Sequence, residues 1–360
     1  MSLLRSETTC QIGGVLATAL AGSWRPFTQE IVCAESSLAE IVPLLIGSMS
    51  GALGWWRIRH TALRSSPTAL KLQEAYRLHS IGSKLREHSI KQVLSVLYSA
   101  GIEPLLVKGW AVARLYPETG LRPYGDIDLL VRREQHALAK KAIRSVDVSY
   151  WVDLHAGAGT LDSRPFEELH ERSIIVKLDD FEVRVPAPED HFRLLCVHML
   201  RHSVHRPMWL CDIAAAAECR PKNFDWELCL GKDKTRARWV TCAIGLARRL
   251  LGADVSGTPV TERSIETPRW LVSRVLKGWE APYSMSQVPV TYQAPMAKYI
   301  REPRGLLADL GRRWPNPIEA TVYVGGPFNE LPRWPFQVGE CIGRTAKFIT
   351  RLPSALREGR

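Results

Sequence analysis

The sequence predicts an α/β (α+β) protein in which helices flank a small sheet and an α-helical C-terminal domain follows. Between residues 102 and 155, short apolar runs alternate with helical stretches in the order strand, helix, strand, helix, strand. Beyond residue 186, apolar residues recur at steps of three and four over 188–201, 208–218 and 236–251, which is the period of helices that bury one face. We therefore expect a sheet domain followed by a helical domain.

A helical pattern also precedes the sheet, over residues 67–100. Its apolar positions recur at helical steps and predict one or two amphipathic helices, which Gly101 ends as a C-cap residue. The apolar positions are Leu70, Leu72, Ala75, Leu78, Ile81, Leu85, Ile90, Val93, Leu94 and Leu97.

The sheet region itself divides at its Gly and Pro residues. Lys108-Gly109 forms a tight turn after the first strand, and Pro117 closes the helix that follows it. The elements expected are strands at 102–107, 126–131 and 146–155, helices at 110–116 and 134–145, and a hairpin at 173–185. After residue 281, Pro and Trp become frequent, which predicts an irregular segment with a last helix near 342–350.

These patterns divide the chain into four parts. They are an N-terminal helical extension (1–65), a core with its leading helices (66–187), a helical domain (188–280) and a Pro/Trp-rich C-terminal segment (281–360).

Composition limits the class of protein. The 360 residues are 46% hydrophobic, as in folded globular proteins, and the formal net charge is +11. This surplus favours polyanionic partners such as nucleotides or RNA, but no dense Lys/Arg block resembles a nucleic-acid-binding arm. The eight cysteines contain no CxxC pair and lie mostly in apolar surroundings, so we expect reduced core residues of a cytoplasmic protein.

The uncharged stretch 41–56 is the one membrane candidate. It is shorter than the roughly 20 residues of a membrane-spanning helix, and Pro43 and three glycines interrupt it. A buried helix is therefore expected there, with no membrane partner, and the N-terminus does not resemble a signal peptide.

Acidic residues at the start of the second strand carry the functional prediction. Asp126 and Asp128 are two residues apart, so in a strand their side chains project from the same face. Asp153 and His155 repeat this spacing on the next strand, which lets Asp153 stand beside the first two acids. Carboxylates held so close repel unless a cation lies between them, and oxygen ligands suit Mg²⁺.

Three carboxylates beside a Lys-Gly turn match the requirements of phosphoryl or nucleotidyl transfer. Divalent ions bridge the acids and a triphosphate, and a carboxylate such as Asp153 can accept the proton of the attacking hydroxyl. Lys108 and Arg122 are candidate phosphate contacts, together with the backbone at Gly109. On spacing alone, solvated acids at a strand end explain the Asp-x-Asp pair equally well, because that pattern is common.

Several motifs in order resemble one family. LVKG (106–109), LYP (115–117), LRP (121–123), GDIDLLV (125–131) and VDLH (152–155) are followed by PAPEDHFRLLCVHMLRH and WLCDIA. Together they resemble the uncharacterised bacterial nucleotidyltransferase family of the polymerase-β-like superfamily. The superfamily usually has Gly-Ser where this chain has Lys108-Gly109-Trp110, so phosphate contacts are not transferred from it.

The resemblance implies a minimal nucleotidyltransferase core with a mixed sheet. Asp126 and Asp128 would bind Mg²⁺ or Mn²⁺, and Asp153 would be the third acid of the metal and catalytic set. The nucleotide-binding candidates are Lys108, Gly109, Arg122 and Gly125.

The function expected is Mg²⁺-dependent transfer of an NMP from an NTP such as ATP to a hydroxyl group, with release of pyrophosphate. The acceptor is a small molecule, a peptide, a protein or an RNA. One alternative is a non-catalytic nucleotide- or partner-binding module of the same fold that serves a biosynthetic pathway. A toxin-like tRNA nucleotidyltransferase, which the basic charge would suit, is a subordinate alternative.

The histidines suggest a second metal hypothesis. His198, His202 and His205 fall on one face of a helix and, with His191 or His155, could build a zinc site. The competing interpretation is packing or hydrogen bonding to the sheet, with Asp212 as a partner. Trp209 is expected in the core rather than as a surface on which bases stack.

Overall fold

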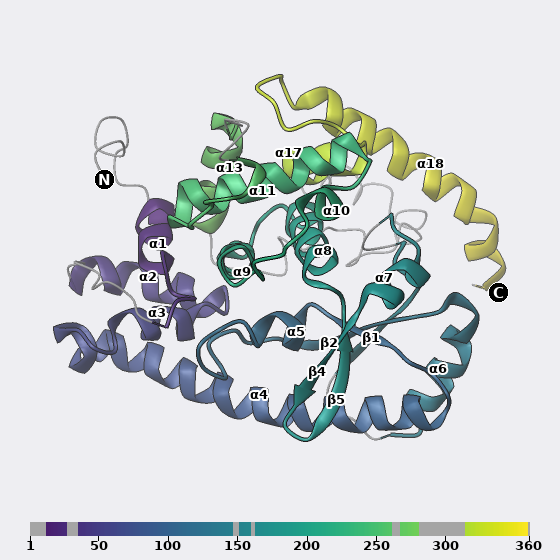
Figure 1. The fold of residues 1–360 in the computed structure, drawn as a ribbon. Coiled ribbons are helices and arrows are strands. Elements are labelled where there is room, and N and C mark those ends of the chain that lie inside the picture. Colours follow the sequence, from purple (N-terminus) through teal and green to yellow (C-terminus); the bar gives the residue numbers. More distant parts are fainter. Residues whose placement is uncertain are drawn as a thin grey trace.

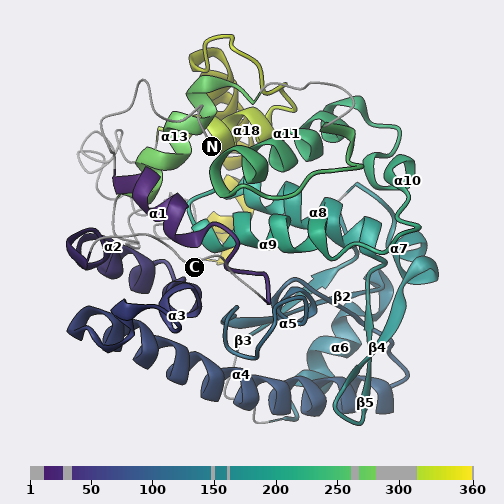
Figure 2. The same cartoon turned by 60° about the vertical axis from the view of Figure 1, so that its left-hand side comes forward.

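The computed structural model describes residues 12–26, 35–146, 151–159, 163–260, 267–280 and 314–358. A small sheet lies between one long helix below it and a layer of helices above it, and both views show this order (Figures 1 and 2). The prediction of an α+β protein with a mixed sheet and a helical C-terminal domain is confirmed.

Three short helices form the N-terminal part, α1 (Ile12–Leu20), α2 (Glu35–Gly47) and α3 (Gly51–Ile58). The single buried helix predicted over 41–56 is wrong, because the chain breaks at residues 48–50 into α2 and α3, with Met49 at φ 63°. All of α3 is buried. None of the described helices combines the length and apolar character needed to cross a membrane.

The helix below the sheet is α4 (Pro67–Ser99), which the 3-10 turn η1 (Ala62–Ser65) precedes. The Ser66 hydroxyl caps its start by accepting from Ala69 N, and Gly101 follows its end at φ 71°, as predicted. Four of the residues predicted to lie on the buried face of α4 are exposed instead, because the rest of the protein packs against only one side of this helix. Leu70, Leu78, Ile81 and Leu85 are each more than half exposed.

The main sheet has the order β1-β2-β3, with β1 (Leu105–Val107), β2 (Asp126–Val131) and β3 (Trp151–Ala156). β1 pairs antiparallel with the central strand β2, and β3 pairs parallel with it. A parallel pair needs a crossover, which η2 (Arg133–Gln135) and α6 (His136–Ile143) supply. The predicted start of the third strand falls partly on 147–150, outside the described residues.

Shorter elements complete the core domain. Helix α5 (Gly109–Ala113) links β1 to β2, and α7 (Phe166–Arg172) precedes the hairpin. The predicted hairpin is confirmed as β4 (Ile174–Leu178) and β5 (Phe181–Val185), a separate antiparallel sheet whose turn has Asp179 at φ 55°.

The upper layer contains the helices α8 (Pro188–Arg201), α9 (Pro207–Glu218), α10 (Trp226–Leu230), α11 (Lys234–Leu251) and α13 (Arg269–Trp279). Its apolar core is continuous with that of the N-terminal helices and the first turns of α4, whereas the second half of α4 shares another core with the two sheets. The division of the chain into four parts remains a prediction.

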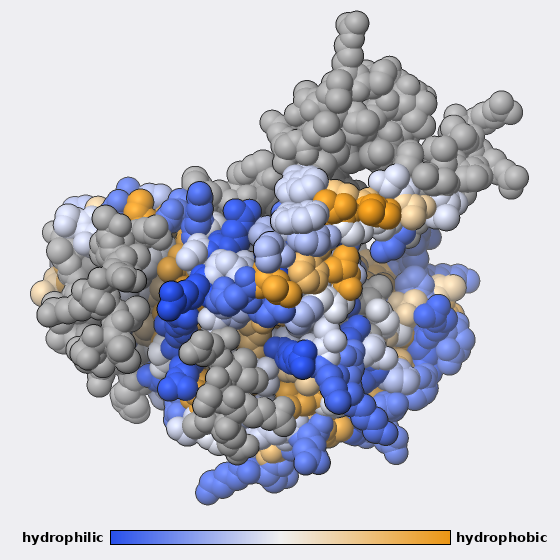
Figure 3. Space-filling model, turned by 90° about the horizontal axis from the view of Figure 1, so that it is seen from above, coloured by the Kyte–Doolittle hydropathy of each residue, from blue (hydrophilic) through white to orange (hydrophobic). Residues whose placement is uncertain are grey.

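The C-terminal part contains α17 (Pro317–Tyr323) and α18 (Trp334–Glu358). The irregular segment predicted there is confirmed for residues 314–316 and 324–333, which lie outside both helices. It is wrong for the helices themselves, because Pro317 and Pro335 stand in their first turns, where proline is tolerated. The predicted last helix, 342–350, is the middle of α18. Seen from above, the surface mixes hydrophilic and apolar side chains (Figure 3). The exposed apolar residues of this part include Val324, Leu331, Val338 and Ile342.

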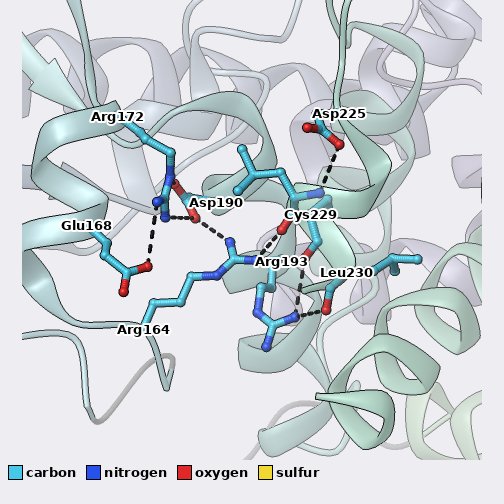
Figure 4. Close-up of polar contacts among 9 residues, drawn as sticks. Arg164, Glu168, Arg172, Asp190, Arg193, Asp225, Cys229 and Leu230 are labelled. Carbon is cyan, nitrogen blue, oxygen red and sulfur yellow. Dashed lines mark hydrogen bonds and ion pairs between the residues drawn. The ribbon is translucent and has the colours of Figure 1, made fainter. Parts of the chain in front are cut away.

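An arginine network joins the core domain to the helical layer. The buried Asp190 carboxylate on α8 accepts hydrogen bonds from Arg172 Nε at 2.9 Å and from Arg164 (Figure 4). Arg164 and the buried Arg193 also donate to backbone carbonyls at the end of α10, including that of Cys229. The carboxylate therefore ties α7 and α8 together, and the arginines tie both to α10.

We predict that Asp190→Asn lowers the free energy of unfolding by about 3 kcal/mol, because it leaves two guanidinium groups facing a neutral side chain inside the protein. Urea unfolding measures this loss. Glu168→Ala is the matched control, since Glu168 is 54% exposed and lies 3.6 Å from Arg172, and it should cost less than about 0.5 kcal/mol. If both variants lost the same free energy of unfolding, the buried carboxylate of Asp190 would not stabilise the protein more than an exposed one does.

A buried carboxyl at the start of α17 predicts a pH dependence of stability. Burial raises the pKa of Glu319 to about 7, and Glu340 adds to the rise, although Arg344 at 2.8 Å opposes it. A folded-state pKa above the unfolded value of 4.5 means that the folded protein binds the proton more tightly. This stabilisation is present below pH 4.5 and is lost as pH rises through 7.

Between pH 5 and pH 8, the wild type should therefore lose about 2–3 kcal/mol more stability than Glu319→Gln. Denaturant unfolding at the two pH values measures the difference. The same loss in wild type and variant would show that Glu319 does not titrate in this way.

Candidate active site

The acidic residues meet on one face of the three-stranded sheet. In the parallel pair of β2 and β3, Asp128 lies directly across from Asp153, and Asp126 lies across from Trp151. His155 follows Asp153 by two residues and projects from the same face. One ligand atom each from Asp128, Asp153 and His155 lies within 4.8 Å of the other two. Among the described residues, this is the group of His, Cys, Asp and Glu side chains that could hold a metal ion.

His155 links the two strands electrostatically. Its Nε2 lies 3.2 Å from Asp153 Oδ2 and 3.7 Å from Asp128 Oδ1. Burial lowers the pKa of His155, but the two neighbouring carboxylates outweigh burial and raise it to about 9. The contact with His155 in turn lowers the pKa of Asp153. Outside the zinc alternative, the sequence predicts no role for His155, although its spacing from Asp153 was the signal for this position.

Lys108 contacts the same acid from the other side. It stands between β1 and α5 with φ 52°, a left-handed backbone conformation that is costly for a residue with a side chain. Its buried ammonium group forms an ion pair with Asp128. The sequence predicts a phosphate contact for Lys108, and the structure places it within reach of the acids.

Asp126 lies outside this group, and its side chain is partly buried on the same face of β2. Burial is the main cause that raises the pKa of Asp126; the charge of Asp128 adds to the rise, and the opposing charges of Lys108 and Arg122 do not cancel it. By formal charge, Lys108 and a protonated His155 balance two of the three carboxylates of Asp126, Asp128 and Asp153, because Arg122 is paired with Asp212. Because the uncompensated donors are carboxylate oxygens, the residues fit a hard divalent cation such as Mg²⁺ or Mn²⁺.

Arg122 lies in a buried ion pair with Asp212 of α9. Its Nη2 donates to Asp212 Oδ2 at 2.7 Å and its Nε to Asp212 Oδ1 at 3.1 Å, and the Tyr116 hydroxyl donates to Oδ1 at 2.8 Å. The phosphate contact predicted for Arg122 finds no support in this pairing. We also expected Asp212 to accept hydrogen bonds from the histidines, but its partners are Arg122 and Tyr116. These contacts fix α9 against the loop before β2.

The two glycines predicted to bind nucleotide, Gly109 and Gly125, differ in backbone conformation and in the space around them. Gly109 has φ 30°, and a Cβ there would only touch the Asp126 carbonyl oxygen at 3.5 Å. At Gly125 a Cβ would meet nothing within 4 Å. Both glycines flank the acids, and neither position is closed to a small side chain by crowding.

The zinc alternative finds no support in the described part of the chain, where the metal-ligand group is Asp128, Asp153 and His155. The single helix face expected for the three histidines is wrong, because α8 ends at Arg201 and carries only His198 of the three. The rings of His198, His202 and His205 gather around Trp209. Trp209 is partly buried and packs against the apolar core, so its expected place there is confirmed in part.

The chain is similar to a family of known proteins. The model of a family described as "uncharacterised nucleotidyltransferase" matches residues 52–153 and 148–252, more than half of the chain. No curated protein matches. A solved structure of an antigenic nucleotidyltransferase-like protein from Paracoccidioides brasiliensis is 13% identical, with a TM-score of 0.38, over 50% of this chain and 97% of that one.

The family match covers the acidic strands, the Lys-Gly turn and the first helices of the upper layer. It confirms the resemblance seen in the sequence motifs, and the chain belongs to the family of uncharacterised nucleotidyltransferases.

Proposed function

We propose that this protein is a divalent-metal-dependent nucleotidyltransferase that transfers an NMP from an NTP to a hydroxyl group of an acceptor and releases pyrophosphate. The observation that carries the proposal is the pairing of Asp128 with Asp153 across neighbouring strands, close enough to share a metal ion, with Asp126 on the same face of β2. Family membership supports the reaction type.

Asp126, Asp128 and Asp153 would hold the ion with carboxylate oxygens, and His155 would orient two of them, because its Nε2 lies 3.2 Å from Asp153 and 3.7 Å from Asp128. A divalent ion there supplies neutralisation of the charge on the transferred phosphoryl group and on the departing pyrophosphate. Lys108 keeps Asp128 in place and lies close enough to the acids to contact a phosphate oxygen.

Asp153 is the acid best placed to accept the proton of the acceptor hydroxyl. Its side chain is 43% exposed, whereas that of Asp128 is 3% exposed, so an acceptor can approach it from solvent. The hydrogen bond that lowers the pKa of Asp153 keeps it ionised at neutral pH. Arg122, buried against Asp212, acts as a positioning residue for the loop that leads into β2.

We predict that Asp128→Asn and Asp126→Asn each lower the rate of pyrophosphate release from NTP by at least about a hundredfold, because loss even of groups that only orient metal ligands costs 10–100-fold. A coupled pyrophosphate assay with each NTP measures the rate. Glu167→Gln is the matched control, because Glu167 is 61% exposed on α7 and should keep the wild-type rate. Unchanged rates in the two aspartate variants would remove them from the mechanism.

One observation favours a second candidate function, a non-catalytic nucleotide-binding module. Asp128 already contacts two basic side chains of the chain itself, Lys108 and His155, which partly take the place of a metal ion. A module of this kind would bind nucleotide without needing the ion.

Chelation with EDTA separates the two candidates. If the protein is an enzyme, EDTA should abolish pyrophosphate release and weaken NTP affinity at least about tenfold, and Mg²⁺ or Mn²⁺ should restore both. Calorimetric titration of NTP into the chelated and the metal-supplied protein measures the affinity. The same affinity in both, with no turnover, would favour the non-catalytic module.

A further inference from the structure

Four aromatic rings gather at the turn between α8 and α9. The ring of Trp209 has its centroid 4.9 Å from that of His198, 5.5 Å from that of His202 and 4.7 Å from that of His205. All four side chains are partly exposed, so the cluster reaches the surface. We call these four residues the aromatic cluster.

The aromatic cluster is tied to the loop that leads into the acids. On α9, Trp209 precedes Asp212 by three residues, about 4.5 Å along the helix and on the same face. Asp212 holds Arg122, which stands four residues before Asp126. Burial is the main cause that lowers the pKa of His198 and of His202, and the charge of Lys108, whose ammonium group contacts Asp128, adds to this effect.

A strained turn holds the cluster in this position. Ser203 and Val204 have φ values of 59° and 54°, and a left-handed conformation is a true outlier for a β-branched residue such as valine. Val204 is fully buried, and its carbonyl accepts a hydrogen bond from Trp279 Nε1 at 2.8 Å. Strain of this kind persists where the surrounding structure enforces it, and it concentrates at functional sites.

The rings of the cluster are suited to bind a flat, uncharged partner. Burial lowers the pKa of His202 and of His205 to about 4, so both imidazoles are neutral at pH 7. The Arg206 guanidinium carbon lies over the Trp209 ring, 5.3 Å from its centroid, and adds hydrogen-bond donors to the cluster. Trp209 packs against the apolar core with part of its indole, and the rest of the side chain is exposed.

We propose that the aromatic cluster binds the nucleobase of the NTP by stacking, with Trp209 and His202 as the main contacts. The inference rests on the proposed nucleotidyltransferase function and names the part of the chain that holds the base. With the base at the aromatic cluster and the phosphates between Lys108 and the acids, one nucleotide would span from α9 to β2. The stacking contacts are made before and during the reaction, so they serve binding and not the chemical step.

The test measures binding separately from catalysis. Nonhydrolysable analogues of ATP, GTP, CTP and UTP, blocked between the α- and β-phosphates, are titrated with Mg²⁺ into the full chain by calorimetry. Loss of one stacking partner should weaken binding at least about tenfold in Trp209→Leu and in His202→Leu. Trp209→Phe keeps an aromatic face and should remain within about threefold of wild type.

Trp334→Leu is the matched control, because Trp334 is 64% exposed on α18 and should bind like the wild type. Thermal unfolding shows whether each variant is folded. If Trp209→Leu does not fold, the affinity of His202→Leu for the analogues decides the test. In turnover assays, Trp209→Leu should raise KM at least about tenfold and change kcat by less than about threefold.

Two results would overturn the inference alone. The first is that the wild type binds an analogue and that Trp209→Leu and His202→Leu both bind the same analogue with an affinity within twofold of the wild-type value. The other is a tenfold loss in Trp151→Leu with none in Trp209→Leu, which would place the base at the exposed indole of β3, across from Asp126. A wild type that binds none of the four analogues would overturn the proposed function together with the inference.

Discussion

The parallel pairing of β2 with β3 is the constraint on which the site depends. It places Asp128 directly across from Asp153, and strand alternation then puts His155 on the same face. A slip of one residue would turn Asp153 and His155 to the opposite face, toward the partly buried Val152 and Leu154 that pack on the core. Because those apolar side chains must face the core, burial of one face sets the register that assembles the acids on the other.

Charge balance explains the unusual backbone at the edge of the site. Asp128 is almost fully buried, and a carboxylate there requires partners. Lys108 reaches it only because the chain turns sharply between β1 and α5, at the cost of a left-handed lysine. His155 provides a second contact from β3. Asp126 retains a raised pKa in spite of these cations, chiefly because it is partly buried. The three carboxylates outnumber Lys108 and His155, which leaves a negative potential at the start of β2.

The helical layer is coupled to this potential through one buried ion pair. Arg122 and Asp212 are 6% and 2% exposed, and a buried pair of this kind stabilises little, but it specifies which surfaces meet. Here it joins the loop before β2 to α9, with the Tyr116 hydroxyl as a further donor. The pair also holds α9, which carries Trp209 of the aromatic cluster, against this loop.

The sequence by itself determined the elements and the acids of the sheet. Strand and helix have different repeat lengths, so alternation at Asp126 and Asp128, the hairpin at 173–185 and the helical steps beyond residue 186 could be recognised locally. The tertiary structure alone decided the partners. Arg122 pairs with a residue 90 positions away, His155 joins the acid group, and the outer leucines of α4 stay exposed. Repeat lengths follow from backbone geometry within a few residues, whereas these contacts follow from how distant surfaces pack, which no local pattern contains.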